Sequence, residues 1–217
     1  MPQITKITPQ KNQDRYNVYI DNQFAFGVDK IIFVEKGLKE GKEISRKDID
    51  EIIKKDKIAK FLDLANAFLS MRPRSEGELK EYLAKKISKT EQVKFYEAAK
   101  SPIIAKVLAV LKKYGYIDDK SFTKWYVSSR LKTNQKSVRM IKYELKKKGI
   151  SGEILEKLDF SVSQDRKSAI NAVQKKIERW QKLTPLEFKK KFFSYLLLRG
   201  FDYETINETF AFFRQKR

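Results

Sequence analysis

Large apolar residues alternate with polar ones in two short runs near the start of the chain, residues 16–20 and 24–28. The runs flank Asp21-Asn22, and period-two alternation on both sides of such a pair predicts a β-hairpin. Residues 29–36 fit a short helix that ends at Gly37. We therefore expect a small accessory β element at the N-terminus, followed by helical structure.

The register of this hairpin has two solutions. A two-residue turn sets Ile20 opposite Gln23, whereas a three-residue turn sets it opposite Phe24. Because an isolated hairpin is only marginally stable in water, we expect either a further strand that contains Ile4 and Ile7 or packing of the hairpin on a helix.

Apolar positions follow a helical period from Ser45 onward. Ser45 and Asp48 predict a helix start, and the apolar spacing continues to Leu69, in one long helix or in two. Pro73 disfavours helical backbone at the residue before it. This segment is therefore expected to end near Met71.

Two further helices complete a first helical unit. Ser75 and Glu78 form a capping box, in which each side chain satisfies a free backbone N–H at the helix start. Residues 88–100 are polar and are expected to be looser. Ser101-Pro102 then starts a helix whose apolar face ends at Tyr114-Gly115.

Two more helical units follow. Residues 135–148 and 151–158 are expected to be helices of the next unit, and Thr184-Pro185 with Glu187 starts a helix of the last. The predicted fold is mainly α, an elongated array of tandem three-helix, homeodomain-like repeats with a small N-terminal β extension. The predicted parts are the β-rich extension 1–44, a first helical repeat with a leading helix 45–117, a second three-helix repeat 118–160 and a third 161–217.

One helix end recurs 51 positions later. The shift superposes an apolar residue, a glycine, an apolar plug and a helix cap, and the matched pairs are Leu145 with Leu196, Gly149 with Gly200, Ile150 with Phe201, Ser151 with Asp202 and Leu155 with Ile206. Such self-similarity indicates a repeated helical module. Leu197 and Leu198 replace Lys146 and Lys147, so we expect the third repeat to bury what the second exposes.

Composition limits the classes of function. The 217 residues are 41% hydrophobic, and 48 basic against 28 acidic side chains give a net charge of +20. This charge indicates an anionic partner, such as nucleic acid, an acidic protein surface or a membrane. Cysteine and histidine are absent, which excludes disulfides, imidazole-dependent catalysis and the usual zinc sites. We expect no metal, no cofactor, no membrane span and no secretory signal, and hence a cytoplasmic protein.

The densest charge lies on the predicted helix 135–148. Its apolar residues Val138, Ile141 and Leu145 occupy a narrow arc, and basic residues cover most of the rest, opposed only by Glu144. A solvated lysine face is the ordinary interpretation, but repulsion at this density favours a surface that an anionic partner relieves. The candidate contact residues are Lys132, Lys136, Arg139, Lys142, Lys146 and Lys147.

Other candidates give weaker signals. Arg72 and Arg74 flank a proline just before a capped helix N-terminus, where guanidinium and free N–H groups suit phosphate or carboxylate, unless they are merely solvated. Trp125, Tyr126 and Trp180 sit among basic residues and could stack on bases, but their helical spacing favours core packing.

No motif indicates catalysis. Asp118-Asp119 is the one tempting carboxylate pair, and it is better explained as a helix cap than as a metal site. A glycine-rich phosphate-binding loop is absent from the sequence. An enzyme, for instance a nuclease, is therefore disfavoured.

Three stretches carry a family resemblance. They are Phe68-Leu69-Ser70-Met71-Arg72-Pro73-Arg74-Ser75 followed by Glu78-Leu79 and Leu83; Lys136-Ser137-Val138-Arg139 with Glu144-Leu145-Lys146-Lys147-Lys148-Gly149-Ile150; and, more loosely, Leu198-Arg199-Gly200-Phe201. Together they resemble the repeat signatures of the RecX family over about residues 58–214. Residues 88–100 depart from the shorter linker that the family leads us to expect, and the N-terminal β region resembles an extension seen in some members.

The resemblance implies a non-enzymatic regulator of the RecA recombinase. Such proteins bind along the groove of the RecA filament on single-stranded DNA, inhibit its ATPase and strand exchange, promote its disassembly and bind DNA themselves. Under this hypothesis the basic residues of the second repeat meet phosphate or an acidic protein surface, and Arg72 and Arg74 act at the first repeat. We expect a monomer that acts in recombination, DNA repair and the SOS response, with double-stranded DNA as an open second ligand.

A rival hypothesis is a stand-alone basic DNA-binding helical-repeat protein that acts without RecA. It predicts tight DNA binding with a steep salt dependence, since each phosphate contact contributes a slope of about −0.7 on single strands. The two hypotheses differ in whether RecA is needed.

Overall fold

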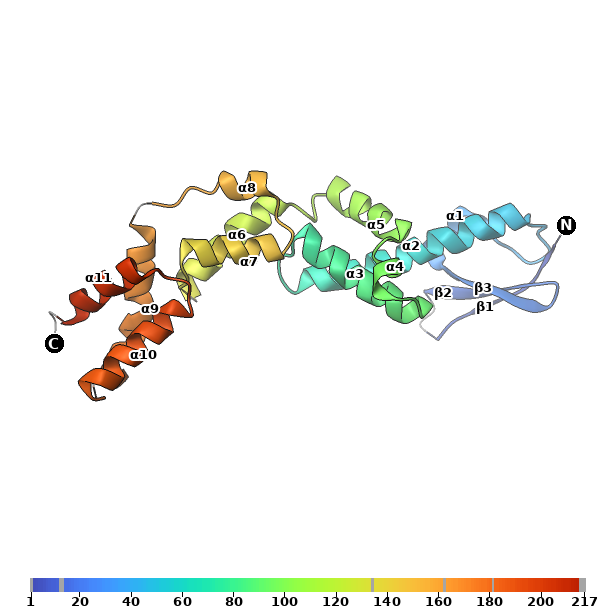
Figure 1. Cartoon of the computed structure of the whole chain (residues 1–217). Helices are drawn as coiled ribbons and strands as arrows, with labels where there is room; N and C mark the ends of the chain where they lie inside the picture. Colours follow the sequence, from blue (N-terminus) through green and yellow to red (C-terminus); the bar gives the residue numbers. More distant parts are fainter. Residues whose placement is uncertain (1, 12–13, 134, 162, 181, 215–217) are drawn as a thin grey trace. The chain divides into compact units, whose positions relative to one another are not determined.

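The computed structural model describes residues 2–11, 14–133, 135–161, 163–180 and 182–214 (Figure 1). The chain forms two compact units, Met1–Arg72 with Lys80–Tyr116 and Pro73–Leu79 with Ile117–Arg217. Both units are mainly helical, and the first also holds a small antiparallel sheet. The predicted fold class is confirmed in these terms, whereas the division at residues 44, 117 and 160 stays a prediction.

The N-terminal sheet has three strands in the order β1-β2-β3, with bounds β1 Ile4–Pro9, β2 Arg15–Ile20 and β3 Gln23–Asp29. Ile20 pairs with Gln23, so the turn has two residues. Both turn residues, Asp21 and Asn22, have positive φ (49° and 65°), as a type I′ turn requires. The further strand expected around Ile4 is present as β1, and it completes a sheet that the hairpin alone would not stabilise.

A long helix packs on this sheet. α1 (Lys30–Glu35) is followed by Gly37, as expected, and α2 (Arg46–Ser70) is one continuous helix. Ser45 caps α2 by accepting a hydrogen bond from the N–H of Asp48 (3.1 Å). The shared core is formed by buried apolar residues that include Ile4, Val18, Phe26, Val28 and Ile52.

Three more helices complete the first helical repeat: α3 (Glu76–Glu91), α4 (Phe95–Ala98) and α5 (Pro102–Lys113). The predicted capping box is present, with Ser75 Oγ accepting from Glu78 N and Glu78 Oε2 accepting from Ser75 N. The prediction that residues 88–100 are looser is wrong. α3 continues into this stretch as far as Glu91, the Ser88 hydroxyl donates to the Val93 carbonyl (2.7 Å) in the turn that follows, and α4 then buries Ala98.

The second unit holds two three-helix repeats with separate cores. Their helices are α6 (Asp119–Thr133), α7 (Val138–Lys147) and α8 (Gly152–Glu156), then α9 (Gln164–Trp180), α10 (Pro185–Leu197) and α11 (Tyr203–Arg214). One core is built around Phe122, Ile141 and Leu145. The other is built around Phe192 and Phe201.

The predicted helix end recurs in three dimensions. Gly149 and Gly200 have φ of 82° and 84°, a left-handed conformation that favours glycine. The next N–H in each case donates to the carbonyl five residues earlier, at 3.2 and 3.3 Å, which is a Schellman turn. The leucine and the plug matched by the 51-residue shift are buried in both repeats. Of the matched caps, the Asp202 carboxylate accepts from Thr205 N (2.8 Å), whereas the Ser151 side chain makes no cap hydrogen bond.

The expectation that the third repeat buries Leu197 and Leu198 is wrong. These side chains are 38% and 79% exposed. They occupy the same outward positions as Lys146 and Lys147 in the second repeat, which are also exposed. In both repeats the inward position belongs to the preceding leucine, so changing the outward pair from lysine to leucine alters the surface and not the core.

Candidate functional site

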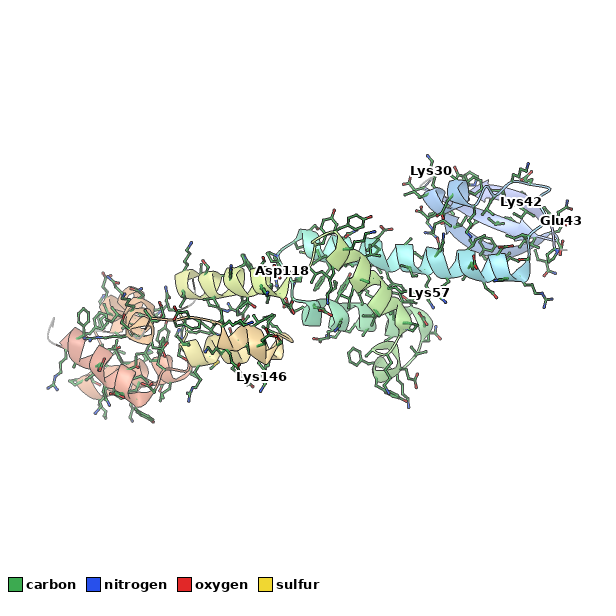
Figure 2. All side chains as sticks on the ribbon, turned by 90° about the horizontal axis from the view of Figure 1, so that it is seen from above. Lys30, Lys42, Glu43, Lys57, Asp118 and Lys146 are labelled. Atoms are coloured by element: carbon green, nitrogen blue, oxygen red, sulfur yellow. The ribbon has the colours of Figure 1, made fainter. Side chains whose placement is uncertain are left out.

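The basic candidates of the second repeat lie on α7, on the last turn of α6 and on the segment between them. α7 starts at the cap Ser137, whose hydroxyl accepts from Met140 N (3.1 Å). Ile141 and Leu145 face the core. The remaining faces therefore carry the charge, and Lys146 is labelled there in Figure 2.

Lys136 is held by a carboxylate within the repeat. Glu144 accepts hydrogen bonds from the hydroxyl of Tyr126 (2.7 Å), from Nε of Arg130 (3.0 Å) and from Lys136. Burial alone raises the pKa of Glu144, but the hydrogen bonds from Lys136 and Tyr126 and the charges of Arg130 and Lys136 outweigh it, so the pKa is lowered. The single acidic residue of this helix thus organises a structural network, and Lys136 is the candidate that forms an ion pair within it.

The other five candidates on this surface form no ion pair with a carboxylate in the described part of the chain, although the charge of Arg139 acts on the nearby carboxylates of Asp165 and Asp202. Arg139 donates to the Gly200 carbonyl (3.3 Å), Lys142 lies over the ring of Phe160 and Lys147 over the ring of Tyr143. The Tyr143 hydroxyl raises the pKa of Lys147. We call this set the α7 basic surface: Lys132, Arg139, Lys142, Lys146 and Lys147.

The helix start at Ser75 is joined to distant parts of the second unit. Ser75 Oγ donates to the Lys148 carbonyl (2.6 Å), and the Asp119 carboxylate accepts from Glu76 N (2.8 Å). Lys148 also pairs with Glu78 (2.5 Å). A Cβ on Gly77 would lie 2.3 Å from the same Lys148 carbonyl. This close packing explains why the helix start requires glycine at that position.

The same joint recurs between the second and third repeats. Ser137 N donates to the Arg199 carbonyl (3.0 Å), and the Asp165 carboxylate accepts from Val138 N (2.7 Å). Sequence reasoning missed both aspartates as joint residues. A signal exists, because a shift of 46 positions matches Asp119 with Asp165 while a shift of 62 matches Ser75 with Ser137.

The structure also shows how far the two arginines near Pro73 and the aromatic candidates are buried. Arg72 and Arg74 are each half-buried, and each makes contacts within the protein, so neither is merely a solvated loop side chain. Trp180 and Tyr126 are buried in their repeats, as the core interpretation predicts. The ring of Trp125 is tilted by 43° to that of Phe122, and its side chain is 37% exposed, so the core interpretation does not hold for this residue.

The carboxylate pair that starts α6 serves as two caps. Asp118 Oδ1 and Oδ2 accept from the backbone N–H groups of Lys120 (2.9 Å) and Ser121 (3.3 Å) at the helix start labelled in Figure 2. These bonds, with the Ser121 hydroxyl as the largest cause, lower the pKa of Asp118. Asp119 caps α3. The cap interpretation is therefore confirmed.

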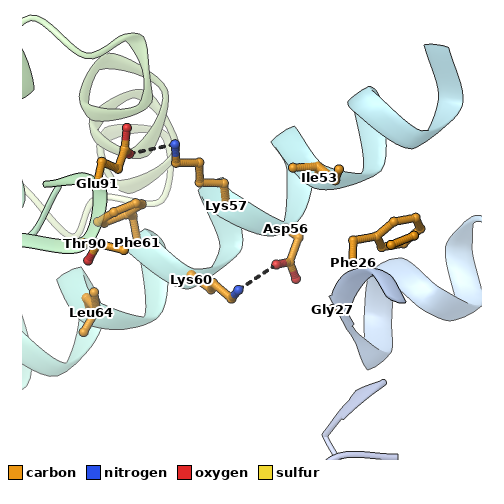
Figure 3. A pocket seen from close by; sticks show the side chains of 11 residues that line it. Phe26, Gly27, Ile53, Asp56, Lys57, Lys60, Phe61, Leu64, Thr90 and Glu91 are labelled. Atoms are coloured by element: carbon orange, nitrogen blue, oxygen red, sulfur yellow. Dashed lines mark ion pairs between the residues drawn. The ribbon is translucent and has the colours of Figure 1, made fainter. Parts of the chain in front are cut away.

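Each unit holds a pocket of its own. In the first unit, β3, α2 and the end of α3 surround about 490 Å³, lined by Phe26, Ile53 and Phe61. The four charged side chains at its wall are already paired, Lys60 with Asp56 and Lys57 with Glu91 (Figure 3). In the second unit, α6 and α8 enclose about 440 Å³, bordered by lysines and by the buried Thr123. Neither pocket carries an arrangement that indicates catalysis.

No helix in the described ranges is both long and apolar enough to cross a membrane.

Comparison with known proteins identifies relatives along nearly the whole chain. Regulatory protein RecX of Bacillus subtilis is 35% identical over 210 residues, which cover 95% of this chain and 75% of that protein. Regulatory protein RecX of Listeria monocytogenes is 33% identical, with 93% and 72% covered. A crystal structure of regulatory protein RecX has a TM-score of 0.64 at 24% identity, covering 97% of this chain and all of that one. RecX from Lactobacillus salivarius has a TM-score of 0.53 at 23% identity, covering 72% and 96%.

Domain models of one family match in order along the chain. Residues 2–45 match the regulatory protein RecX N-terminal domain, residues 118–157 the second RecX three-helix domain and residues 164–210 the third. The N-terminal sheet is therefore a family domain, and the two repeats of the second unit are the family's repeats. On these matches and the identity to the Bacillus subtilis protein, the chain belongs to the RecX family of regulatory proteins.

Proposed function

We propose that this protein is a non-enzymatic regulator that binds the RecA filament on single-stranded DNA and inhibits its ATPase and strand exchange. The observation that carries the proposal is the α7 basic surface, where five cations gather and form no ion pair with a carboxylate in the described chain. A nucleoprotein filament supplies both phosphate and acidic side chains. Binding would relieve the mutual repulsion of these cations.

Within the second repeat, some charged residues are proposed to stabilise the fold and others to contact the partner. Glu144 holds α7 against α6 through Tyr126 and Arg130 and also binds Lys136. Lys142, Lys146 and Lys147 of the same helix would then meet the partner. Arg72 and Arg74 are proposed as further contacts at the first repeat. The protein would act as a monomer in recombination, DNA repair and the SOS response, in the cytoplasm.

The test is ATP hydrolysis by RecA on single-stranded DNA with the purified protein added. Inhibition at ratios well below one protein per RecA is expected, because a regulator that disassembles filaments acts on many subunits. Hydrolysis that is unchanged at such ratios would contradict the proposal.

A second candidate is DNA binding without RecA, which the net charge of +20 favours. This activity predicts affinity for DNA alone that falls steeply with salt, by a slope of about −0.7 per phosphate contact on single strands. Salt-insensitive or absent DNA binding would exclude it. If DNA binds tightly but RecA hydrolysis is unaffected, this candidate replaces the first.

A further inference from the structure

Four helices in the described chain end in the same glycine turn, at Gly37, Gly115, Gly149 and Gly200. All four glycines have positive φ, and in each turn the N–H after the glycine donates to the carbonyl five residues earlier, at 2.9 to 3.3 Å. The backbone is therefore the same at all four positions. Differences between the turns lie in the side chains that flank the glycine.

Three of the turns use the flanking residues for packing. The residue after the glycine is a buried plug in each, namely Leu38, Ile150 or Phe201. The residue before the glycine is a cation with an internal partner: Lys36 pairs with Glu51, Lys148 pairs with Glu78 and Arg199 lies over the ring of Tyr195.

The turn at Gly115 departs from this pattern on both sides. Tyr114 and Tyr116 take the two flanking positions, and they are 66% and 64% exposed. Burial is instead supplied one residue later by Ile117. The turn is closed by backbone hydrogen bonds and uses neither ring. Packing of the turn therefore does not explain why two large aromatic side chains are exposed to solvent at this position.

The geometry and charge around these rings fit a specific partner. Their centroids are 6.5 Å apart with planes inclined by 45°, so each ring can offer a face. Lys112 and Lys113 precede them and are exposed, and Lys113 Nζ lies 5.8 Å from the Tyr114 centroid. Exposed aromatic faces beside lysines are the combination with which proteins hold single strands, by base stacking and phosphate attraction.

We infer that Tyr114 and Tyr116 form a stacking site for the bases of single-stranded nucleic acid. Because lysines lie beside the rings, a polyanion fits this surface better than an apolar protein surface does. Single strands are favoured over a duplex, because base pairing and stacking in a duplex hide the base faces on which the rings would stack. The inference rests on the proposed function in naming DNA as a ligand, and it adds the nucleobase as the recognised group. It is tested without RecA, so its failure is distinguishable from failure of the proposed function.

The experiment measures binding of end-labelled oligothymidine to the full chain by fluorescence anisotropy. A matched abasic oligonucleotide keeps the phosphates and lacks the bases. Tyr114→Ala with Tyr116→Ala is expected to weaken oligothymidine binding about tenfold, since one base–aromatic stack contributes about that factor or more. Binding of the abasic strand and the salt slope, which count phosphate contacts, are expected to stay as in the unsubstituted protein.

Two control variants make the result specific. Tyr114→Phe with Tyr116→Phe keeps both rings and is expected to keep the affinity. Tyr203→Ala removes an equally exposed tyrosine (63%) of α11 and is expected to change nothing. Unchanged affinity of the alanine pair, an equal loss on the abasic strand, or an equal loss in the phenylalanine pair would each overturn the inference.

Discussion

Thr123 is a buried residue whose hydroxyl has no hydrogen-bond partner among the described residues. Leaving such a group unpaired costs about 1–3 kcal/mol. Thr123→Val is therefore predicted to raise the free energy of unfolding by about 1 kcal/mol, as measured by urea denaturation. Thr209→Val is the matched control, because that hydroxyl is equally buried but donates to the Thr205 carbonyl (2.7 Å), and it should lower stability. Equal losses in both variants would contradict an unpaired Thr123 hydroxyl.

Gly77 lies where the start of α3 meets the end of α7. An added methyl group would meet the Lys148 carbonyl at 2.3 Å, and backbone shifts of this kind cost about 1–3 kcal/mol. Gly77→Ala is predicted to lower the thermal midpoint of unfolding despite the better helix propensity of alanine. Gly152→Ala, in α8 with no atom within 4 Å of the new methyl group, is the control and should be neutral or stabilising. Similar midpoints for the two variants would contradict the described joint.

At the scale of elements, Glu144 joins α7 to α6 through Tyr126 and Arg130, and to the segment between the two helices through Lys136. Because its pKa is lowered from 4.5 in the folded protein, the ionised form stabilises the fold. This contribution is fully present above the unfolded pKa and is lost as pH falls through the folded value. Comparing urea unfolding of Glu144→Gln with the unsubstituted protein should give a stability difference at pH 7 that shrinks below about pH 4.5. A difference that does not change with pH would contradict an ionic network.

Local signals in the sequence predicted the helix ends well. The caps at Ser45, Ser75 and Thr184 each bond a residue three positions on, so a few neighbouring residues determine them. The roles of Asp119 and Asp165 could not be predicted in the same way. Their backbone partners lie 43 and 27 residues away, and only the folded repeats bring them together.

The pattern of apolar and polar residues did not determine the hairpin register, and it gave a wrong prediction for residues 88–100. Both hairpin registers satisfied the alternation, and the structure selects the two-residue turn, with a register shift between Val18 and Tyr19 that the alternation does not reveal. Residues 88–100 were misjudged from their polarity. The stretch holds the last turn of α3 and the short helix α4, tied by the hydrogen bond from the Ser88 hydroxyl and by the burial of Ala98.

Within the second repeat, where the basic candidates are densest, the sequence identified the cations but not which of them are paired. Lys136 belongs to the Glu144 network, so Lys136→Glu would bring two carboxylates together and is expected to reduce stability. Lys142, Lys146 and Lys147 have no such partner among the residues described and can be neutralised without that cost. These three residues therefore separate a role in partner binding from a role in folding.

The central claim is that the α7 basic surface carries the regulatory contact. The measurement is the concentration of protein that halves RecA ATP hydrolysis on single-stranded DNA, compared between two triple variants of equal charge change. Lys142, Lys146 and Lys147→Gln is predicted to raise this concentration about tenfold or more, an affinity loss of about 1.4 kcal/mol. The control is Lys189, Lys190 and Lys191→Gln on α10, where all three lysines are exposed, and it should leave inhibition nearly unchanged. Equal effects of the two triple variants, or no effect of the first, would contradict the claim.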